Sequence, residues 1–190
     1  MFLQNSDCPG LMTKRETRVQ LLAELNLPKQ GVIWDIGSGV GSIGLEALRI
    51  SPNLKLVSID KRVGSKNIIE ENAKRTGVRP SLIIEDEILN IFKENKITPS
   101  LLHPDRVIIG GGGSNSHLII EEVLKLINSY CILVIPLISL KSISKLESIL
   151  QPKVHKLSIS QHQSYRGVNI GEDIRLSPLN PVFILKGEVQ

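Results

Sequence analysis

The chain has 190 residues, of which 41% are hydrophobic and 22% charged, the balance of an ordinary globular protein with an aliphatic core. Aromatic residues make up only 3%, which argues against a nucleic-acid binder that stacks bases on aromatic side chains. The formal net charge of +4 is too small to indicate nucleic acid, but it suits an anionic small molecule. We therefore expect no nucleic-acid partner.

Cys8 and Cys131 lie far apart, and no CxxC or Cys/His cluster accompanies them. We expect neither a metal site nor a disulfide, and two free thiols are typical of a reducing cytoplasm. The first residues contain no apolar signal core, and no apolar run reaches about 18 residues. A cytoplasmic protein with no membrane partner is the expectation.

Residues 1–12 read as an irregular arm, and a helix follows as far as about Asn26. Thr13 is predicted to cap this helix, because Glu16 three residues later completes a capping-box pattern. The apolar stripe of the helix is predicted to be Val19, Leu22 and Leu25.

Five alternations of strand and helix follow this first helix. Aliphatic runs predict strands at 32–36, 54–59, 81–85, 105–110 and 130–135. Helices are expected up to about residue 51 and over 62–77, 87–95, 116–128 and 139–150. Strands that alternate with helices indicate right-handed crossovers and a parallel sheet with helices on both faces.

The pattern changes after Pro152. Residues 154–160 and 181–187 are strand-like, whereas the residues between them show little helical periodicity and are expected to form a long loop. The predicted fold is therefore α/β, with a doubly wound, mostly parallel seven-stranded sheet that ends in an antiparallel strand pair. This single domain over 1–190 is typical of Rossmann-like class I S-adenosylmethionine-dependent methyltransferases.

A glycine-rich segment closes the first strand and opens the next helix. Its predicted cofactor-binding residues are Asp35, Gly37, Ser38, Gly39, Val40 and Gly41. Glycines let the backbone turn tightly and approach a ligand that a Cβ would hold off. Asp60 ends the next strand, where a carboxylate can accept hydrogen bonds from both ribose hydroxyls of an adenosine.

The spacing Gly39, Gly41 and Gly44 also fits the dinucleotide pattern GxGxxG, and a purely structural turn would need glycines too. Two acidic features favour S-adenosyl-L-methionine over NAD. Asp35 can face the cationic methionine end of that cofactor, where it would repel a pyrophosphate. Asp86 and Glu87 end the third strand, where an acid can reach the adenine amino group, although acids at a helix start also occur only for their interaction with the helix dipole.

The loop after the fourth strand borders the predicted site, because ligands in such sheets bind beyond the carboxyl ends of the strands. Its predicted substrate-binding residues are Gly110, Gly111, Gly112, Gly113 and Ser114. Exposed N–H groups there suit a carboxylate, and a flexible loop is the alternative.

Basic residues form two further groups, at the start of the first helix and in the long final loop. These residues are Lys14, Arg15, Arg18, Arg166 and Arg175. If both segments fold over the cofactor, they supply cations to a polycarboxylate substrate; solvated surface charge is the alternative. No residue is assigned as an acid or base catalyst.

Four segments together resemble the decarboxylating precorrin methyltransferase family of cobalamin biosynthesis, over roughly residues 11–187. These segments are MTKRE at 12–16, WDIGSGVGS at 34–42, DRVIIGGGGS at 105–114 and NPVFIL at 180–185. The resemblance implies methylation of carbon 15 of a precorrin or cobalt-precorrin (cobalt-precorrin-6B), with loss of the ring C acetate carboxyl at carbon 12. It also implies S-adenosyl-L-methionine as cofactor, an anionic tetrapyrrole as substrate and a homo-oligomer.

The resemblance places cofactor contacts on Thr13, on the segment from Gly37 to Gly41, on Asp60 and on Glu87. The family pattern Gly-Asp-Ala is replaced by Glu85-Asp86-Glu87, and the glycine loop after the fourth strand reads GGGGS. The alternatives are a methyltransferase acting on RNA or another small molecule, a non-catalytic binding domain, and a nicotinamide enzyme.

Overall fold

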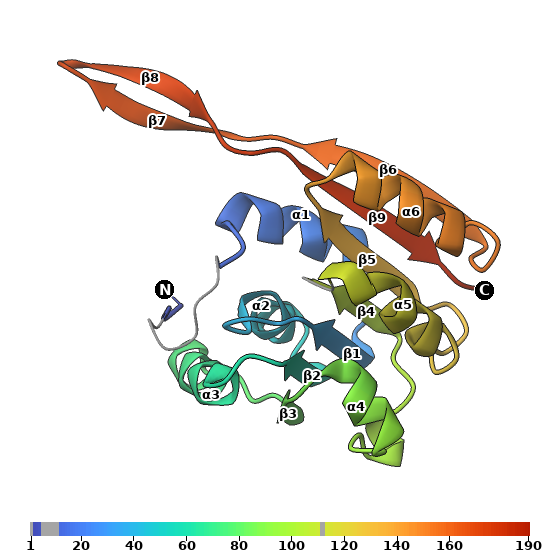
Figure 1. Ribbon diagram of the computed structural model, residues 1–190. Helices are drawn as coiled ribbons and strands as arrows, with labels where there is room; N and C mark the ends of the chain where they lie inside the picture. Colours follow the sequence, from blue (N-terminus) through green and yellow to red (C-terminus); the bar gives the residue numbers. More distant parts are fainter. Residues whose placement is uncertain (1, 5–11, 111–112) are drawn as a thin grey trace.

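The structure is a computed structural model that describes residues 2–4, 12–110 and 113–190 (Figure 1). Its strands are β1 (Gln30–Ile36), β2 (Asn53–Asp60), β3 (Leu82–Glu85), β4 (Arg106–Ile109), β5 (Ile132–Leu137), β6 (Lys156–His162), β7 (Tyr165–Ile170), β8 (Asp173–Pro178) and β9 (Val182–Glu188). Its helices are α1 (Arg15–Leu25), α2 (Ser42–Ile50), α3 (Ser65–Thr76), α4 (Ile88–Lys93), α5 (Ser116–Leu124) and α6 (Leu140–Leu150), with 3-10 turns η1 (Pro99–Leu101) and η2 (Gly113–Asn115). None of the helices in these ranges is both long enough and apolar enough to cross a membrane.

Seven strands form the central sheet in the order β3-β2-β1-β4-β5-β9-β6, and β1 to β5 run parallel. β9 pairs with β5 and with β6 in antiparallel fashion, so the predicted sheet and its terminal strand pair are confirmed. Ile36 at the end of β1 is level with Ile59 of β2 and Ile109 of β4. The order of strands reverses between β1 and β4, and this is where open α/β sheets bind ligands.

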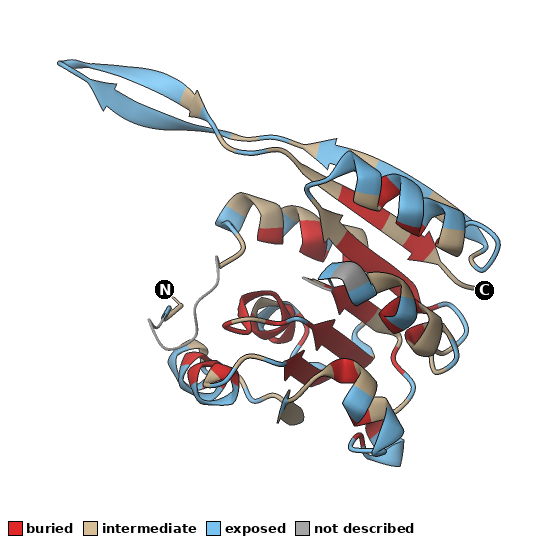
Figure 2. Cartoon of the chain, viewed as in Figure 1, coloured by how far each residue is buried: buried red, intermediate tan, exposed pale blue. Residues whose placement is uncertain are grey.

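Helices cover both faces of the sheet because the side chains of each buried strand alternate between two apolar clusters. In β1, Trp34 and its neighbours at 32 and 36 pack with α4, α5 and α6, whereas Ile33 packs with α1 and α2. The indole N–H of Trp34 donates to the Leu101 carbonyl oxygen at 2.8 Å, which satisfies a fully buried polar group. Figure 2 shows the buried strands in the middle of the molecule between partly exposed helices.

The prediction of a long loop between the last two sheet strands is wrong, because β7 and β8 form an antiparallel hairpin there. This hairpin continues β6 and β9 outward and projects from the body of the protein (Figure 1). Gly171, with φ of +60°, begins its two-residue turn, a position that favours glycine. Nearly every hairpin residue is exposed, so no buried face imposes the alternation by which strands are usually recognised.

The predicted start of α1 is also wrong. Lys14 is the N-cap and no side chain caps the helix, so Thr13 and Glu16 do not form the expected capping box. Val19 is 54% exposed and lies outside the apolar stripe, which consists of Leu21, Leu22 and Leu25.

Asp35 carries the one carboxyl group on β1, and it points to the α2 side of the sheet. The residue is 1% exposed, and its Oδ2 accepts a hydrogen bond of 2.9 Å from the Gly44 amide of α2. Burial raises the pKa of Asp35 to about 7; the Gly44 hydrogen bond opposes this shift, and the nearby charge of Asp60 adds to it.

This shift makes stability depend on pH. In the unfolded chain Asp35 ionises near its ordinary value of 3.8, and in the folded protein near 7. Between these values the folded state holds a proton that the unfolded state has lost, so stability falls as pH rises through this window and levels off above it. We predict that Asp35→Asn, which retains an acceptor for Gly44, gains stability relative to the natural protein from pH 4.5 to pH 8. Denaturant unfolding across this range should show a relative gain of at most about 4 kcal/mol.

Asp173→Asn is the control, because this carboxyl is exposed at the hairpin turn. Its stability profile should run parallel to that of the natural protein. A parallel profile for Asp35→Asn as well would contradict the burial of an ionisable carboxyl beneath α2.

Candidate active site

The segment from Gly37 to Gly41 crosses the carboxyl ends of β1 and β2. The amides of Gly37 and Ser38 both donate to the Ile59 carbonyl oxygen, at 2.8 and 3.0 Å. Gly37 has φ of +72°, and a Cβ on it would lie 1.9 Å from the carbonyl oxygen of Gly110 after β4. The ends of β1 and β4 can therefore approach each other only with glycine at position 37.

Two adjoining cavities open along this segment. The larger one, called the β1–β2 cavity, holds about 410 Å³ and is lined by Thr13, Gly37, Asp60, Asp86, Glu87 and Gly110 among others. A smaller one of about 60 Å³ is lined by Thr13, Gly37, Ser38, Gly39 and Val40 among others. The structure thus brings most of the predicted cofactor residues together, although Asp35 and Gly41 line neither cavity.

Asp60 is an acceptor in the wall of the β1–β2 cavity. Its Oδ2 accepts the Gly39 amide at 2.7 Å, and its two oxygens accept Nη2 and Nε of Arg62, each at 2.9 Å. Burial raises the pKa of Asp60, but the hydrogen bonds from Arg62 and Gly39 outweigh burial and hold it below its ordinary value. An ionised carboxylate therefore stands beside the glycine turn at neutral pH.

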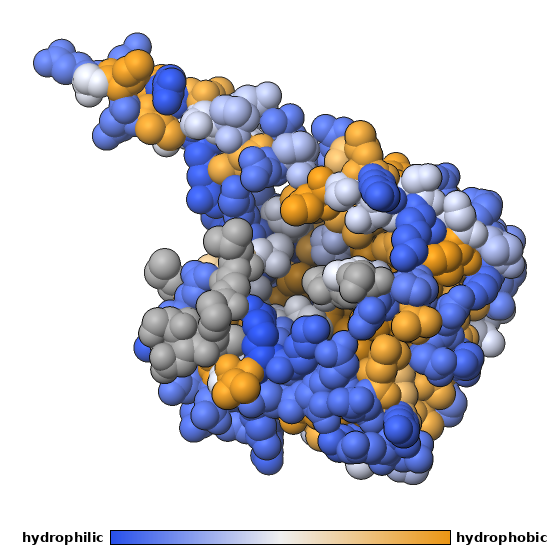
Figure 3. Space-filling view, in the orientation of Figure 1, coloured by the Kyte–Doolittle hydropathy of each residue, from blue (hydrophilic) through white to orange (hydrophobic). Residues whose placement is uncertain are grey.

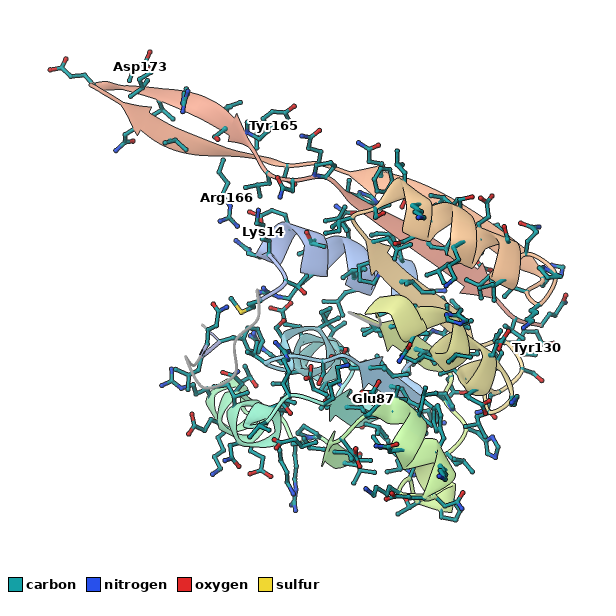
Figure 4. All side chains as sticks on the ribbon, in the orientation of Figure 1. Lys14, Glu87, Tyr130, Tyr165, Arg166 and Asp173 are labelled. Atoms are coloured by element: carbon teal, nitrogen blue, oxygen red, sulfur yellow. The ribbon has the colours of Figure 1, made fainter. Side chains whose placement is uncertain are left out.

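The three acidic residues at the end of β3, Glu85, Asp86 and Glu87, lie in different surroundings. Glu85, at the family's glycine position, turns away from the β1–β2 cavity, and its Oε2 accepts the Lys66 amide at the start of α3 at 3.0 Å. Asp86 accepts Lys96 Nζ at 2.5 Å and the Glu87 amide at 2.7 Å, and these bonds lower its pKa. Glu87 lies at the start of α4 beside the cavity (Figure 4).

The chemistry of these walls fits a nucleoside-containing cofactor. Ser38 Oγ is buried and has no hydrogen-bond partner among the described residues, although buried hydroxyls are normally paired. It borders the smaller cavity, where a polar ligand could satisfy it. Asp60 supplies an ionised acceptor, and the glycines leave the backbone uncovered.

Thr13 reaches the cavities because a buried ion pair holds the chain before α1. Arg18 is 7% exposed; its guanidinium donates to both carboxylate oxygens of Glu46 on α2, at 3.0 and 2.8 Å. The same group donates to the Thr13 carbonyl oxygen at 2.7 Å. Arg18 therefore positions Thr13. The sequence pattern grouped Arg18 with exposed cations and did not indicate this positioning role.

Asn72 is a second anchor that sequence reasoning missed. This fully buried residue of α3 accepts the Leu3 amide at 2.6 Å and donates to the carbonyl oxygens of Leu3 and Val40, at 3.1 and 3.0 Å. It ties residues near the chain start to the glycine segment. The available signal was the spacing of Asn72, which follows Ile68 by four residues and Ile69 by three and so lies on the same side of the helix.

The predicted substrate cations are spread out. Lys14 and Arg15 are exposed at the start of α1, and neither lines the β1–β2 cavity. Arg166 reaches from the hairpin toward this region (Figure 4) and pairs with Glu16 through bonds of 3.0 and 2.7 Å. Hydrogen bonds from Arg166 are the main reason that the pKa of Glu16 falls to about 2.

The two described ends of the glycine segment after β4 line different cavities. Gly110 lines the β1–β2 cavity, and Gly113 lines a cavity of about 560 Å³ between the ends of β4 and β5 and the starts of α5 and α6. Gly111, Gly112 and the side chain of Ser114 lie outside the described residues. The second cavity, called the β5–α6 cavity, also contains Lys141 and Lys145, which sequence reasoning missed.

Comparisons with known proteins agree with this architecture. The family model described as precorrin methyltransferase domain matches residues 5–187. A protein of Pyrobaculum aerophilum named probable cobalt-precorrin-6B C(15)-methyltransferase (decarboxylating) is 34% identical over 92% of this chain and 87% of its own length. A protein of the same name from Saccharolobus solfataricus is 29% identical over 99% of this chain and 92% of its own length.

The fold has a close match among solved structures. The precorrin-6y C5,15-methyltransferase of Geobacter metallireducens superposes with a TM-score of 0.84 at 24% identity, covering 98% of this chain and 93% of that one. A tRNA (m1A58) methyltransferase of Aquifex aeolicus, with a TM-score of 0.74 at 11% identity, covers 100% of this chain and 73% of that one, and it shares the fold alone. With the family model matching nearly its whole length, this chain belongs to the precorrin methyltransferase domain family.

Proposed function

We propose that this chain is an S-adenosyl-L-methionine-dependent enzyme of cobalamin biosynthesis that methylates carbon 15 of a precorrin or cobalt-precorrin. In the same proposal it removes the ring C acetate carboxyl at carbon 12 as carbon dioxide. The observation that carries the proposal is an ionised Asp60 beside an uncovered glycine turn, in a chain of the precorrin methyltransferase family. The name of the Pyrobaculum aerophilum relative supports the choice of reaction.

The cofactor, when bound, supplies a methyl group on a sulfonium. We assign the ribose hydroxyls to Asp60 and the adenine side to Asp86 and Glu87. The backbone from Gly37 to Gly41, including Ser38 and Val40, and Thr13 would close around the remainder. The interaction of Asp35 with the cationic methionine end stays a prediction. This carboxyl would act on the methionine end electrostatically, from beneath the glycine segment. The chain's task is to align donor and acceptor carbon and to exclude water.

Arg62 must move for this binding mode. Its guanidinium makes two of the hydrogen bonds that a ribose would make to Asp60. Its side chain is 33% exposed, so it has room to turn toward solvent. Ribose binding then exchanges one pair of hydrogen bonds on Asp60 for another, and the Gly39 amide holds the carboxylate in place throughout.

For an anionic tetrapyrrole, the predicted contacts are Lys14, Arg15, Arg166 and the segment Gly110, Gly111, Gly112, Gly113 and Ser114. A cytoplasmic location and action as one domain over residues 1–190 also stay predictions.

We further propose a homo-oligomer that buries the projecting hairpin. Tyr165, Ile174 and Leu176 share one face of this hairpin by register, and they are 56%, 66% and 70% exposed. An exposed group of large apolar side chains on a projecting hairpin is typical of an association surface. Copies of the same chain would cover this face symmetrically.

Replacing Ile174 and Leu176 together by lysine should dissociate the oligomer, because the lysines would be buried without partners. Light scattering after gel filtration should give a multiple of 21.0 kDa for the natural chain and a single 21.0 kDa copy for the double variant. Ile50→Lys, at a 63% exposed site on the body of the protein, is the control and should stay assembled. A natural chain that elutes as a single copy refutes the proposal.

Asp60→Ala should weaken S-adenosyl-L-methionine binding by roughly ten- to a hundredfold, because it removes a charged acceptor of hydrogen bonds. Titration calorimetry measures this change. Glu85→Ala is the matched control. Glu85 is the register partner of Asp60 on β3, but its side chain faces α3. The affinity of this variant for S-adenosyl-L-methionine should be unchanged. Equal affinities of Asp60→Ala and the natural chain would refute the ribose assignment.

The reaction itself is tested with freshly prepared cobalt-precorrin-6B or its metal-free counterpart. With S-adenosyl-L-methionine, mass spectrometry should show a product that has gained one methyl group and lost one carbon dioxide. Cofactor binding without conversion of either substrate would contradict the proposed function.

A further inference from the structure

The β5–α6 cavity is a second, separately lined space at the carboxyl edge of the sheet. Its floor is made of buried aliphatic side chains from the strand ends and α6, and these are Ile109, Ile135 and Leu146. Its mouth carries Ile138, which is 81% exposed, and the side chains of Lys141 and Lys145 from the first turns of α6. Figure 3 shows that the molecule is hollowed on this side and that hydrophobic surface lies inside the hollow.

The cavity adjoins the proposed cofactor site. Pro136 of β5 lines both the β5–α6 cavity and the β1–β2 cavity. Gly110 and Gly113, at the two ends of the glycine loop, line one cavity each. A ligand seated in the β5–α6 cavity would therefore lie next to a methyl donor, with Pro136 as a wall shared by both cavities.

The charges around the cavity have one sign. Among its described lining residues there are two lysines and a histidine and no carboxylate. Lys145 Nζ lies 3.3 Å from His117 Nδ1 of α5; because an ammonium can only donate, the ring nitrogen accepts. No described carboxylate pairs with Lys141 or Lys145, whereas Lys125 and Lys153 on another side of the protein each pair with a glutamate.

We propose that the β5–α6 cavity is the seat of the tetrapyrrole, with Lys141 and Lys145 binding its peripheral carboxylates. An aliphatic floor suits the conjugated face of a macrocycle, and ammonium groups with no described carboxylate partner at the mouth suit its acid side chains. The volume of about 560 Å³ falls within the range of ordinary small-molecule sites. This inference rests on the proposed function and names the residues that recognise its substrate.

The test compares two double variants, each of which loses two positive charges. Lys141→Ala with Lys145→Ala removes the cations of the cavity, and Lys125→Ala with Lys153→Ala removes two cations from a different surface. The probe is uroporphyrin, a stable polycarboxylated tetrapyrrole, titrated by its fluorescence. We expect at least about a tenfold loss of affinity for the first variant and less than about twofold for the control.

Steady-state kinetics with the precorrin substrate give the second readout. The cavity variant should raise KM by a similar factor and leave the calorimetric affinity for S-adenosyl-L-methionine unchanged. Lys141→Arg with Lys145→Arg keeps both charges and should restore most of the porphyrin affinity. Equal losses in both alanine variants, or no loss in either, would overturn the inference.

These outcomes separate the inference from the proposed function. If the natural chain binds the cofactor and converts the substrate but the cavity lysines have no effect, only the location of the tetrapyrrole is wrong. If the natural chain shows no conversion at all, the proposed function fails, and the porphyrin titration still decides whether the cavity binds an anionic macrocycle.

Discussion

The close approach of two strand ends determines where everything else in the site lies. A Cβ at Gly37 would lie 1.9 Å from the Gly110 carbonyl oxygen, so the chain after β1 can pass β4 only because no side chain is there. The amides of Gly37 and Ser38 then bond to Ile59, which brings the glycine segment over the end of β2 and next to Asp60. A larger residue at position 37 would push β1 and β4 apart and displace both cavities at once.

Two aspartates near this crossing have opposite pKa shifts because their local surroundings differ. Within the described residues the Asp35 side chain has one hydrogen bond, from Gly44, and it is almost unexposed, so burial raises its pKa to about 7. Asp60 is also largely buried, yet Arg62 and Gly39 hold its pKa below the ordinary value. Only Asp60 combines a firm negative charge with a place in a cavity wall, whereas Asp35 chiefly holds the start of α2 against the sheet.

Periodicity and glycine spacing were enough to predict the sheet, its parallel order and the group of residues around Gly37 and Asp60. They failed where the stabilising contact comes from far along the chain. Glu16 looked like half of a capping box, but Arg166, 150 residues later, binds its carboxylate. The β7–β8 hairpin escaped detection because both strands are exposed and β7 lacks the alternation of polar and apolar residues that Ile174 and Leu176 give to β8.

The lysines of α6 were not predicted as binding residues for a related reason. Their role depends on which strand ends lie beside them in the folded protein. The two cavities differ in charge. Around β1 to β3 the cavity wall holds three acids, Asp60, Asp86 and Glu87, against the two cations Lys61 and Arg62, and this acidic excess suits a cofactor carrying positive charge. Beyond the glycine loop, the described lining of the β5–α6 cavity has cations only, which suit a polycarboxylate. The lysines thus favour an anionic acceptor in the β5–α6 cavity, and the acidic excess favours a cationic donor in the β1–β2 cavity. The two seats share Pro136 as a common wall, and methyl transfer requires donor and acceptor to meet there.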